Sequence, residues 1–293
     1  LVLLKMKNKI NLVAEIGCNH KGDIKIAKKM IDTLSNFCKV KYVKFQKRNN
    51  KKLLSDEEYN SPHPNPENSY GKTYGQHREF LEFSKQKHLS LMKYCKKKKI
   101  EFSCSAWDID SAIDLVKLKL KYIKIPSACN LDFEMIEYLC KNFNGGIHIS
   151  LGMTSKKEEE KIFKLVKKNH RTKDLVLYSC TSGYPVPIKD LNLLEISRLK
   201  KKYAKYGCEI GFSGHYSGIS VDNLAILLGA TWIERHFTLD RTWKGTDHAA
   251  SLEPDGMRRL QVNLGDSLDA LNFKKKEILD IEKFQRKKLK RFL

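Results

Sequence analysis

Apolar runs of four to seven residues recur along the chain, each bounded by polar residues or glycine. Eight of them are mostly apolar without strict alternation, which is typical of strands buried on both faces of a parallel sheet. We expect strands at Leu12–Ile16, Tyr42–Gln46, Ile100–Ser103, Tyr122–Ile125, Gly146–Ser150, Leu175–Cys180, Glu209–Phe212 and Thr231–Phe237.

Amphipathic helical patterns lie between these runs. Asp23 is a plausible N-cap for the apolar positions that follow it, and Ser155 with Glu158 forms a capping box before another helix. Eight such units over about 250 residues predict an α/β fold, a single-domain (β/α)8 TIM barrel. A doubly wound open sheet is the alternative, but no G-x-G-x-x-G follows the first strand. We place the barrel at residues 1–270 and a basic C-terminal helix or tail at residues 271–293.

One interval, residues 47–83, breaks the alternation. It shows no convincing strand or long helix, and residues 61–68 are rich in proline and asparagine. A loop of this length in a compact domain is usually functional or disordered. Because it follows the second strand, we expect it to overhang the catalytic end of the barrel.

The charge is strongly basic, with 56 Lys plus Arg against 34 Asp plus Glu in 293 residues, a net charge of +22. Only ten of the basic residues are arginine, and many lysines lie on predicted outer helix faces, such as Lys164, Lys167 and Lys168. A solvated lysine-rich surface is therefore favoured over nucleic-acid binding. Such a surface would still attract anionic metabolites.

The eight cysteines are scattered, with no C-x-x-C pair, and most lie inside apolar runs. This pattern favours reduced, packed cysteines and a cytoplasmic location over a disulfide framework. No apolar run approaches the roughly 20 residues of a membrane-spanning helix, so we expect no membrane partner.

Polar residues stand at the end of every predicted strand. In a barrel these positions converge on one mouth, where catalytic groups gather. The residues concerned are Glu15, Lys44, Gln46, Ser105, Lys124, Ser127, Ser150, Ser182, Tyr184, Ser213, His215 and His236, with Asp247 in the loop after the last strand.

Lys44 and Lys124 are the most informative of these, because each lies inside an otherwise apolar strand. A buried ammonium is costly unless an anion or a carboxylate meets it. A bound anion such as phosphate is favoured, and an ion pair with Glu15 is the alternative.

His215 and His236 are one βα unit apart, so they would lie on neighbouring strands. Two such histidines can share one divalent cation, with water and substrate oxygens filling the other positions. Two histidines alone are a weak motif, and satisfied core histidines are the alternative.

Several segments resemble the sialic acid synthase family. They are VAEIGCNHKGD from Val13, KFQ from Lys44, GFSGH from Gly211, IERHFTLD from Ile233 and TWKGTDHAASLEP from Thr242. The resemblance runs in order from about Leu12 to Leu260. Residues 71–84 look most like the branch that acts on 6-phosphorylated N-acetylmannosamine.

The resemblance implies an enzyme that condenses phosphoenolpyruvate with an N-acylhexosamine to give a nonulosonic (sialic) acid and phosphate. By position, phosphoenolpyruvate would be held by Lys44, Ser105, Lys124, Ser127, Ser150, Ser182 and Ser213. The sugar would be held by Gln46, Tyr184 and Asp247, with Lys72, Tyr74 and Arg78 as candidates for gripping a 6-phosphate. His215 and His236 would bind Mn²⁺ or Mg²⁺, and both are assigned to catalysis together with Glu15.

The chain departs from the family pattern in three places. Cys129 stands where an acidic residue is frequent, and Ser182 where asparagine is frequent. After Leu260 too little sequence remains for the family's antifreeze-like domain, so we expect a possible homo-oligomer but not the usual swapped dimer. The alternatives are a synthase for an unphosphorylated or legionaminic-type sugar precursor and, from another class, a nucleic-acid-binding barrel without chemistry.

Overall fold

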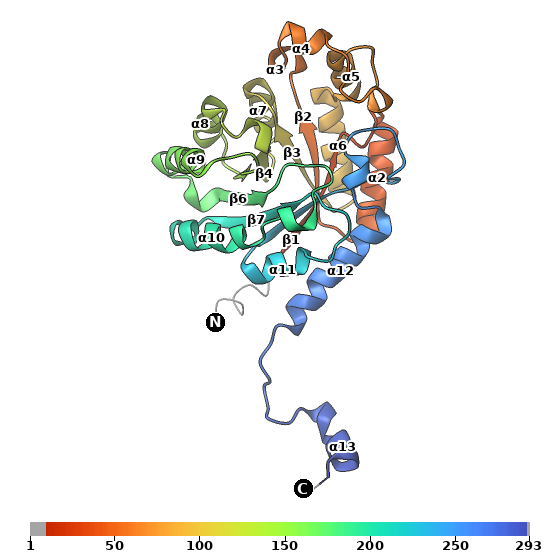
Figure 1. The fold of residues 1–293 in the computed structure, drawn as a ribbon, viewed down its shortest axis with the longest axis vertical. Coiled ribbons are helices and arrows are strands. Elements are labelled where there is room, and N and C mark those ends of the chain that lie inside the picture. The colour runs from red at the N-terminus through yellow and green to blue at the C-terminus, as the bar shows by residue number, and fades with distance from the viewer. Residues whose placement is uncertain (1–9, 292–293) are drawn as a thin grey trace.

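The eight predicted strands close into one barrel. A computed structural model describes residues 10–291, and in it each strand pairs in parallel with its neighbours in the sequence while β8 closes onto β1 (Figure 1). The strands are β1 (Asn11–Gly17), β2 (Tyr42–Lys47), β3 (Glu101–Ala106), β4 (Tyr122–Ile125), β5 (Gly146–Ser150), β6 (Leu175–Cys180), β7 (Glu209–Gly214) and β8 (Trp232–His236). The predicted TIM barrel is confirmed.

Helices cover the outside of the barrel, and their starts follow the expected capping. Asp23 accepts a hydrogen bond from the backbone N–H of Lys25, and Ser155 and Glu158 form the predicted capping box. The covering helices are α2 (Ile24–Asn36), α6 (Lys85–Lys97), α7 (Ile109–Val116), α8 (Phe133–Asn142), α9 (Lys156–Lys168), α10 (Leu194–Tyr203), α11 (Asp222–Leu228) and α12 (Pro254–Ala270).

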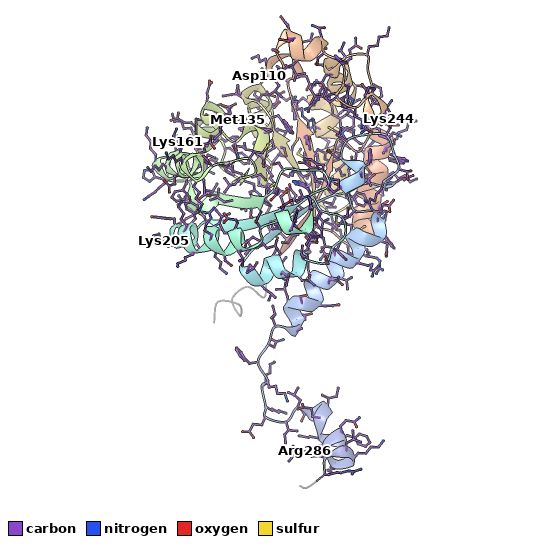
Figure 2. The ribbon with its side chains drawn as sticks, viewed as in Figure 1. Asp110, Met135, Lys161, Lys205, Lys244 and Arg286 are labelled. Carbon is purple, nitrogen blue, oxygen red and sulfur yellow. The ribbon has the colours of Figure 1, made fainter. Side chains whose placement is uncertain are left out.

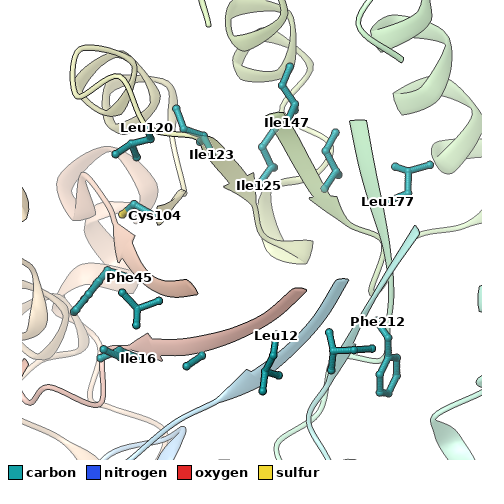
Figure 3. Close-up of a cluster of buried hydrophobic side chains, with 14 of the residues drawn as sticks. Leu12, Ile16, Phe45, Cys104, Leu120, Ile123, Ile125, Ile147, Leu177 and Phe212 are labelled. Atoms are coloured by element: carbon teal, nitrogen blue, oxygen red, sulfur yellow. The ribbon is translucent and has the colours of Figure 1, made fainter. Parts of the chain in front are cut away.

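Two apolar cores result from the alternation of side chains along the strands. Outward residues such as Phe45, Ile123 and Phe212 pack under the helices in the larger core (Figure 3). A smaller cluster contains Tyr122, Tyr178 and Trp232. These three side chains belong to three different strands, and all of them contact the ring of His148. They therefore lie inside the barrel.

The long interval after β2 is more ordered than we predicted. It contains the short helices α3 (Asn50–Leu53), α4 (Asp56–Asn60) and α5 (Tyr74–Leu81) and a 3₁₀ turn at Pro66–Asn68. The sequence does not predict helix α5, because only three of its residues are buried and one of these is Gly75. The glycine is needed there, since a Cβ atom would lie 2.3 Å from the ring of Tyr59 on α4.

The C-terminal segment leaves the barrel after α12 and ends in α13 (Asp280–Leu289), which stands apart from the other helices (Figure 1). Helix α13 has no buried residue. The expected lysine-rich surface is present, as Lys161 and Lys205 at the outer edge illustrate (Figure 2). Between residues 10 and 291, no helix is both long and apolar enough to cross a membrane.

Candidate active site

The carboxyl ends of the strands enclose a cavity of about 300 Å³, to which all eight strands contribute. Their convergence follows from the parallel barrel, in which every strand points its C-terminal end to the same face. Twelve of the predicted site residues line this cavity: Glu15, Lys44, Gln46, Ser105, Lys124, Ser127, Ser150, Ser182, Tyr184, Ser213, His215 and His236. The structure thus brings them together, while their individual roles stay predictions.

Two lysines and two glutamates form a buried charge network in the cavity. The Nζ atom of Lys44 lies 2.5 Å from Glu15 Oε2 and 3.8 Å from Glu234 Oε2. The Nζ atom of Lys124 lies 2.6 Å from Glu234 Oε1. Each ammonium group therefore has a carboxylate partner, so the strand lysines do not by themselves demonstrate an anion site. The alternative of a Lys44–Glu15 ion pair is what the structure contains.

The two lysines differ in their electrostatic environment. Burial lowers the pKa of Lys44, but the carboxylates of Glu15 and Glu234 outweigh this effect and leave it raised. For Lys124 burial prevails over its single carboxylate partner, and the pKa is lowered. Burial raises the pKa of Glu15, whereas Lys124 and Lys44 overcome burial at Glu234 and lower its pKa.

Glu234 is the member of this network that we did not assign from the sequence. Its Oε1 atom accepts hydrogen bonds from Lys124 Nζ at 2.6 Å and from Ser213 Oγ at 3.1 Å. A usable signal was present, because residues two apart in a strand share one face. The assignment of His236 to the mouth therefore placed Glu234 inside the barrel as well.

A cluster of small polar groups lines the same cavity as Lys124. The backbone N–H of Gly152 donates to Ser127 Oγ at 3.1 Å. A Cβ atom on Gly152 would lie 2.4 Å from Ser182 Oγ and 2.7 Å from Ser127 Oγ. Glycine therefore allows the backbone to approach both hydroxyls, which gives a set of hydrogen-bond donors of the kind that holds phosphate or carboxylate oxygens.

His215 and His236 face each other with ring centroids 5.3 Å apart. The Nδ1 atom of His215 lies 3.1 Å from the carbonyl oxygen of Thr181. Because a carbonyl only accepts, Nδ1 carries the proton and Nε2 keeps a free lone pair in the neutral ring. The Nδ1 atom of His236 is buried without a hydrogen-bond partner and lies 3.8 Å from Asp247 Oδ2.

These features fit a site for one divalent cation. Burial lowers the pKa of His236 to about 4, so its imidazole is neutral and able to bind a metal at pH 7. Among residues 10–291 there is no group of three or more His, Cys, Asp or Glu side chains placed to hold a metal. The two imidazoles would therefore supply only part of the coordination shell, and water or substrate oxygens the rest.

The other predicted sugar-binding residues lie outside the main cavity. Asp247, Tyr74 and Arg78 line an adjoining cavity of about 160 Å³ between α5 and the loop after β8. Lys72 is exposed and lines neither cavity. The structure therefore groups Tyr74 and Arg78 with Asp247 and separates Lys72 from them.

Comparison with known proteins places this barrel in a family. The NeuB family pattern matches residues 30–276. The chain belongs to the NeuB family. The expected resemblance to the sialic acid synthases is thus confirmed, and with it the expectation that the protein is an enzyme, a synthase of the phosphoenolpyruvate-dependent, carbon–carbon bond-forming type.

Individual relatives agree with the family assignment. N-acetylneuraminate-9-phosphate synthase from Drosophila melanogaster is 38% identical over 261 residues, which cover 87% of this chain and 67% of the relative. N,N'-diacetyllegionaminic acid synthase from Campylobacter jejuni is 32% identical over 88% of this chain and 78% of the relative. The crystal structure of a sialic acid synthetase from Leptospira borgpetersenii superposes with a TM-score of 0.79 at 28% identity, covering 97% of this chain and 93% of that one.

Proposed function

We propose that the protein condenses phosphoenolpyruvate with N-acetylmannosamine 6-phosphate to give N-acetylneuraminate 9-phosphate and inorganic phosphate. The observation that carries this proposal is the mouth of a NeuB-family barrel in which two lysines and a set of serines face a pair of histidines. The phosphorylated sugar is favoured because N-acetylneuraminate-9-phosphate synthases, at 38% and 37% identity, are more similar to this chain than the legionaminic acid synthase at 32%.

The phosphoenolpyruvate subsite is assigned to the side of the cavity that holds Lys44 and Lys124. Five serine hydroxyls lie around the same cavity, and one of them, that of Ser127, is held in place by the N–H of Gly152. These groups can satisfy the phosphate and carboxylate oxygens, and the buried ammonium groups act strongly because water is excluded. The serines concerned are Ser105, Ser127, Ser150, Ser182 and Ser213.

The sugar is assigned to the region lined by Gln46, Tyr184 and Asp247, where the main cavity meets the adjoining one. His215 and His236 would hold Mn²⁺ or Mg²⁺, which would supply Lewis-acid polarisation of the sugar aldehyde. His215 is oriented for this task by the carbonyl of Thr181. The ring of Tyr184 lies 4.5 Å from the ring of His215, between centroids, and so can hold the open-chain sugar near it.

In the reaction the C2–C3 π electrons of phosphoenolpyruvate form a bond to the aldehyde carbon, and the aldehyde oxygen takes up a proton and becomes a hydroxyl. Water adds at C2 and loses a proton, and the C2–O bond to phosphate breaks as C2 becomes a carbonyl. Glu15 is the group in this chain suited to take the proton that water loses. Burial raises the pKa of its carboxyl, which makes the carboxylate a better base, and Gln46 Nε2 holds it by a hydrogen bond of 2.7 Å. We place the reaction in the cytoplasm, where the eight free cysteines would stay reduced.

The legionaminic acid synthases favour one alternative, a sugar acceptor without phosphate or with further modification. The test is phosphate release from phosphoenolpyruvate with Mn²⁺ and either N-acetylmannosamine or its 6-phosphate, with the product identified by mass spectrometry. We expect a strong preference for the 6-phosphate. A strong preference for the free sugar would overturn the choice of acceptor, and no release with any hexosamine would overturn the reaction.

A pair of matched variants tests the histidines. His236→Asn is expected to abolish phosphate release and to weaken Mn²⁺ binding measured by electron paramagnetic resonance. His170→Asn is the control, because His170 is exposed in a turn with φ 58°, a conformation that asparagine tolerates. Equal Mn²⁺ binding by the two variants would contradict the assignment of His236 to the metal.

A further inference from the structure

The smaller cavity adjoins the main one. Gln46, Trp107, Tyr184 and His236 line both, and α5 and the loop after β8 enclose the remainder. The loop after β8 is held against the interval 47–83, since Tyr70 Oη donates to the carbonyl of Lys244 at 2.5 Å. A substituent on a molecule bound beside His236 can therefore extend into the smaller cavity.

Arg48 is the first of two arginines that line this smaller cavity. Its side chain is 7% exposed, and its guanidinium lies over the indole of Trp107 at 4.1 Å from the ring centroid. It donates to Cys18 Sγ at 3.1 Å and to Gln46 Oε1, while its Nε has no partner. Its guanidinium forms no direct ion pair with a carboxylate among residues 10–291, although Glu82 and Asp247 lie near enough to raise its pKa. A buried guanidinium without a direct carboxylate partner favours an anionic ligand.

Arg78 approaches the same indole from α5. Its guanidinium lies 5.5 Å from the ring centroid of Trp107 and is oriented by the hydroxyl of Tyr74, which accepts from its Nε at 2.9 Å. Within the described part of the chain this arginine also lacks a carboxylate ion pair. Two like charges gathered on one aromatic ring repel each other unless an anion joins them.

Two histidines add hydrogen-bond donors to the cavity. The Nδ1 atom of His63 accepts from the backbone N–H of Asn65 at 3.0 Å, and Nδ1 of His77 accepts from that of Tyr70 at 3.1 Å. Because Nδ1 accepts in each ring, Nε2 is the donor, and it has no protein partner among the described residues. Burial lowers the pKa of His77 to about 4, so this ring stays neutral at pH 7.

We propose that the smaller cavity is the subsite for the phosphate group of a phosphorylated sugar acceptor. Arg48 and Arg78 supply the charge, and the Nε2–H groups of His63 and His77 supply further hydrogen bonds. Asp247 lines the same cavity but lies toward His236, so the phosphate binds at the end formed by α5. This assignment rests on the proposed function, because the subsite would bind the phosphate group that distinguishes the two candidate sugars. In this subsite Arg48, and not the exposed Lys72, binds the phosphate together with Arg78.

The test compares two arginine variants, Arg78→Gln and Arg259→Gln. Arg78 is half-buried on a surface helix, so its replacement leaves the barrel intact; Arg259 is the control, exposed on α12. We expect Arg78→Gln to raise KM for N-acetylmannosamine 6-phosphate about tenfold to a hundredfold, as loss of a charge-assisted hydrogen bond does. The KM values for phosphoenolpyruvate and for free N-acetylmannosamine should stay unchanged, and Arg259→Gln should change none of the three.

A second measurement supplies the two parts of the acceptor, the sugar and the anion, as separate molecules. Phosphite dianion added to free N-acetylmannosamine should accelerate its turnover by the unchanged protein and not by Arg78→Gln. Equal effects of Arg78→Gln on both sugars, or phosphite activation that survives it, would overturn the subsite while the proposed reaction stands. If neither sugar is turned over, binding of the sugar phosphate is measured by calorimetry instead. Weaker binding by Arg78→Gln than by the unchanged protein would support the subsite although the reaction fails. Binding that Arg78→Gln leaves unchanged would overturn it.

Discussion

Replacing Glu234 with glutamine would isolate the energetics of the buried charge network. The variant keeps the shape of the side chain but leaves Lys124 without its carboxylate, whereas Lys44 retains Glu15 at 2.5 Å. Removing one partner of a buried ion pair typically destabilises a protein by about 3–5 kcal/mol. Lys124 is 2% exposed, so solvent cannot replace the lost partner.

The cost has an upper limit, because an unpaired Lys124 can lose its proton instead. Deprotonating a lysine of ordinary pKa, about 10.4, costs about 4.6 kcal/mol at pH 7 and about 1.9 kcal/mol at pH 9. In the variant the folded-state pKa of Lys124 lies below its unfolded value, so the unfolded chain binds more protons between the two. Stability therefore rises with pH in that range, and the destabilisation shrinks from pH 7 toward pH 9.

Urea denaturation of both proteins at pH 7, 8 and 9 would measure this difference. Glu137→Gln is the control, because its partner Lys141 is 60% exposed and the pair is worth less than about 1 kcal/mol. The double variant Lys124→Met/Glu234→Met should recover most of the stability that Glu234→Gln loses. A loss that is the same at pH 7 and pH 9, or a loss no larger than that of the control, would refute the reasoning.

Two further predictions concern close packing at the mouth and a buried arginine. Gly152→Ala should raise KM for phosphoenolpyruvate about tenfold or more, because its Cβ atom would meet two serine hydroxyls; steady-state kinetics checks this. Gly265→Ala, with open space around it, should leave KM unchanged. Arg235→Lys should lower the free energy of unfolding in urea by about 2–3 kcal/mol, because lysine cannot reproduce the hydrogen bonds to Asp222 and two carbonyls; a loss under about 0.5 kcal/mol would contradict it.

The barrel could be predicted because its information is local. The strands at Tyr122–Ile125, Gly146–Ser150 and Leu175–Cys180 have the predicted bounds. Each is an apolar run between polar residues, and a parallel strand buried on both faces leaves such a run in the sequence. The ends of β3 and β7 were predicted two or three residues early, because Ser105 and Gly214 are residue types that commonly mark turns.

The candidate site was predictable where a residue's own strand placed it, and not where a distant partner decides its role. Glu234 is separated from Lys124 by 110 residues, so no local pattern shows that the two form an ion pair. Arg48 likewise depends on Trp107, which belongs to the next βα unit. Such contacts form when the barrel closes. Sequence periodicity predicts the closed barrel but not which side chains meet inside it.

The interior of the barrel explains why the same lysine is costly to bury and useful at the mouth. The ammonium group of Lys124 lies 3.8 Å above the ring of Tyr178, whose hydroxyl lies 3.0 Å from His148 Nδ1. Gly211 makes room for that ring, since a Cβ atom there would lie 2.5 Å from it. This aromatic floor excludes water from below, which lowers the pKa of Lys124 and strengthens every charge interaction above it. A phosphate oxygen placed at the mouth would therefore meet a cation that water does not screen. Burial of this ammonium group lowers the stability of the fold, but the same burial strengthens the binding of an anion.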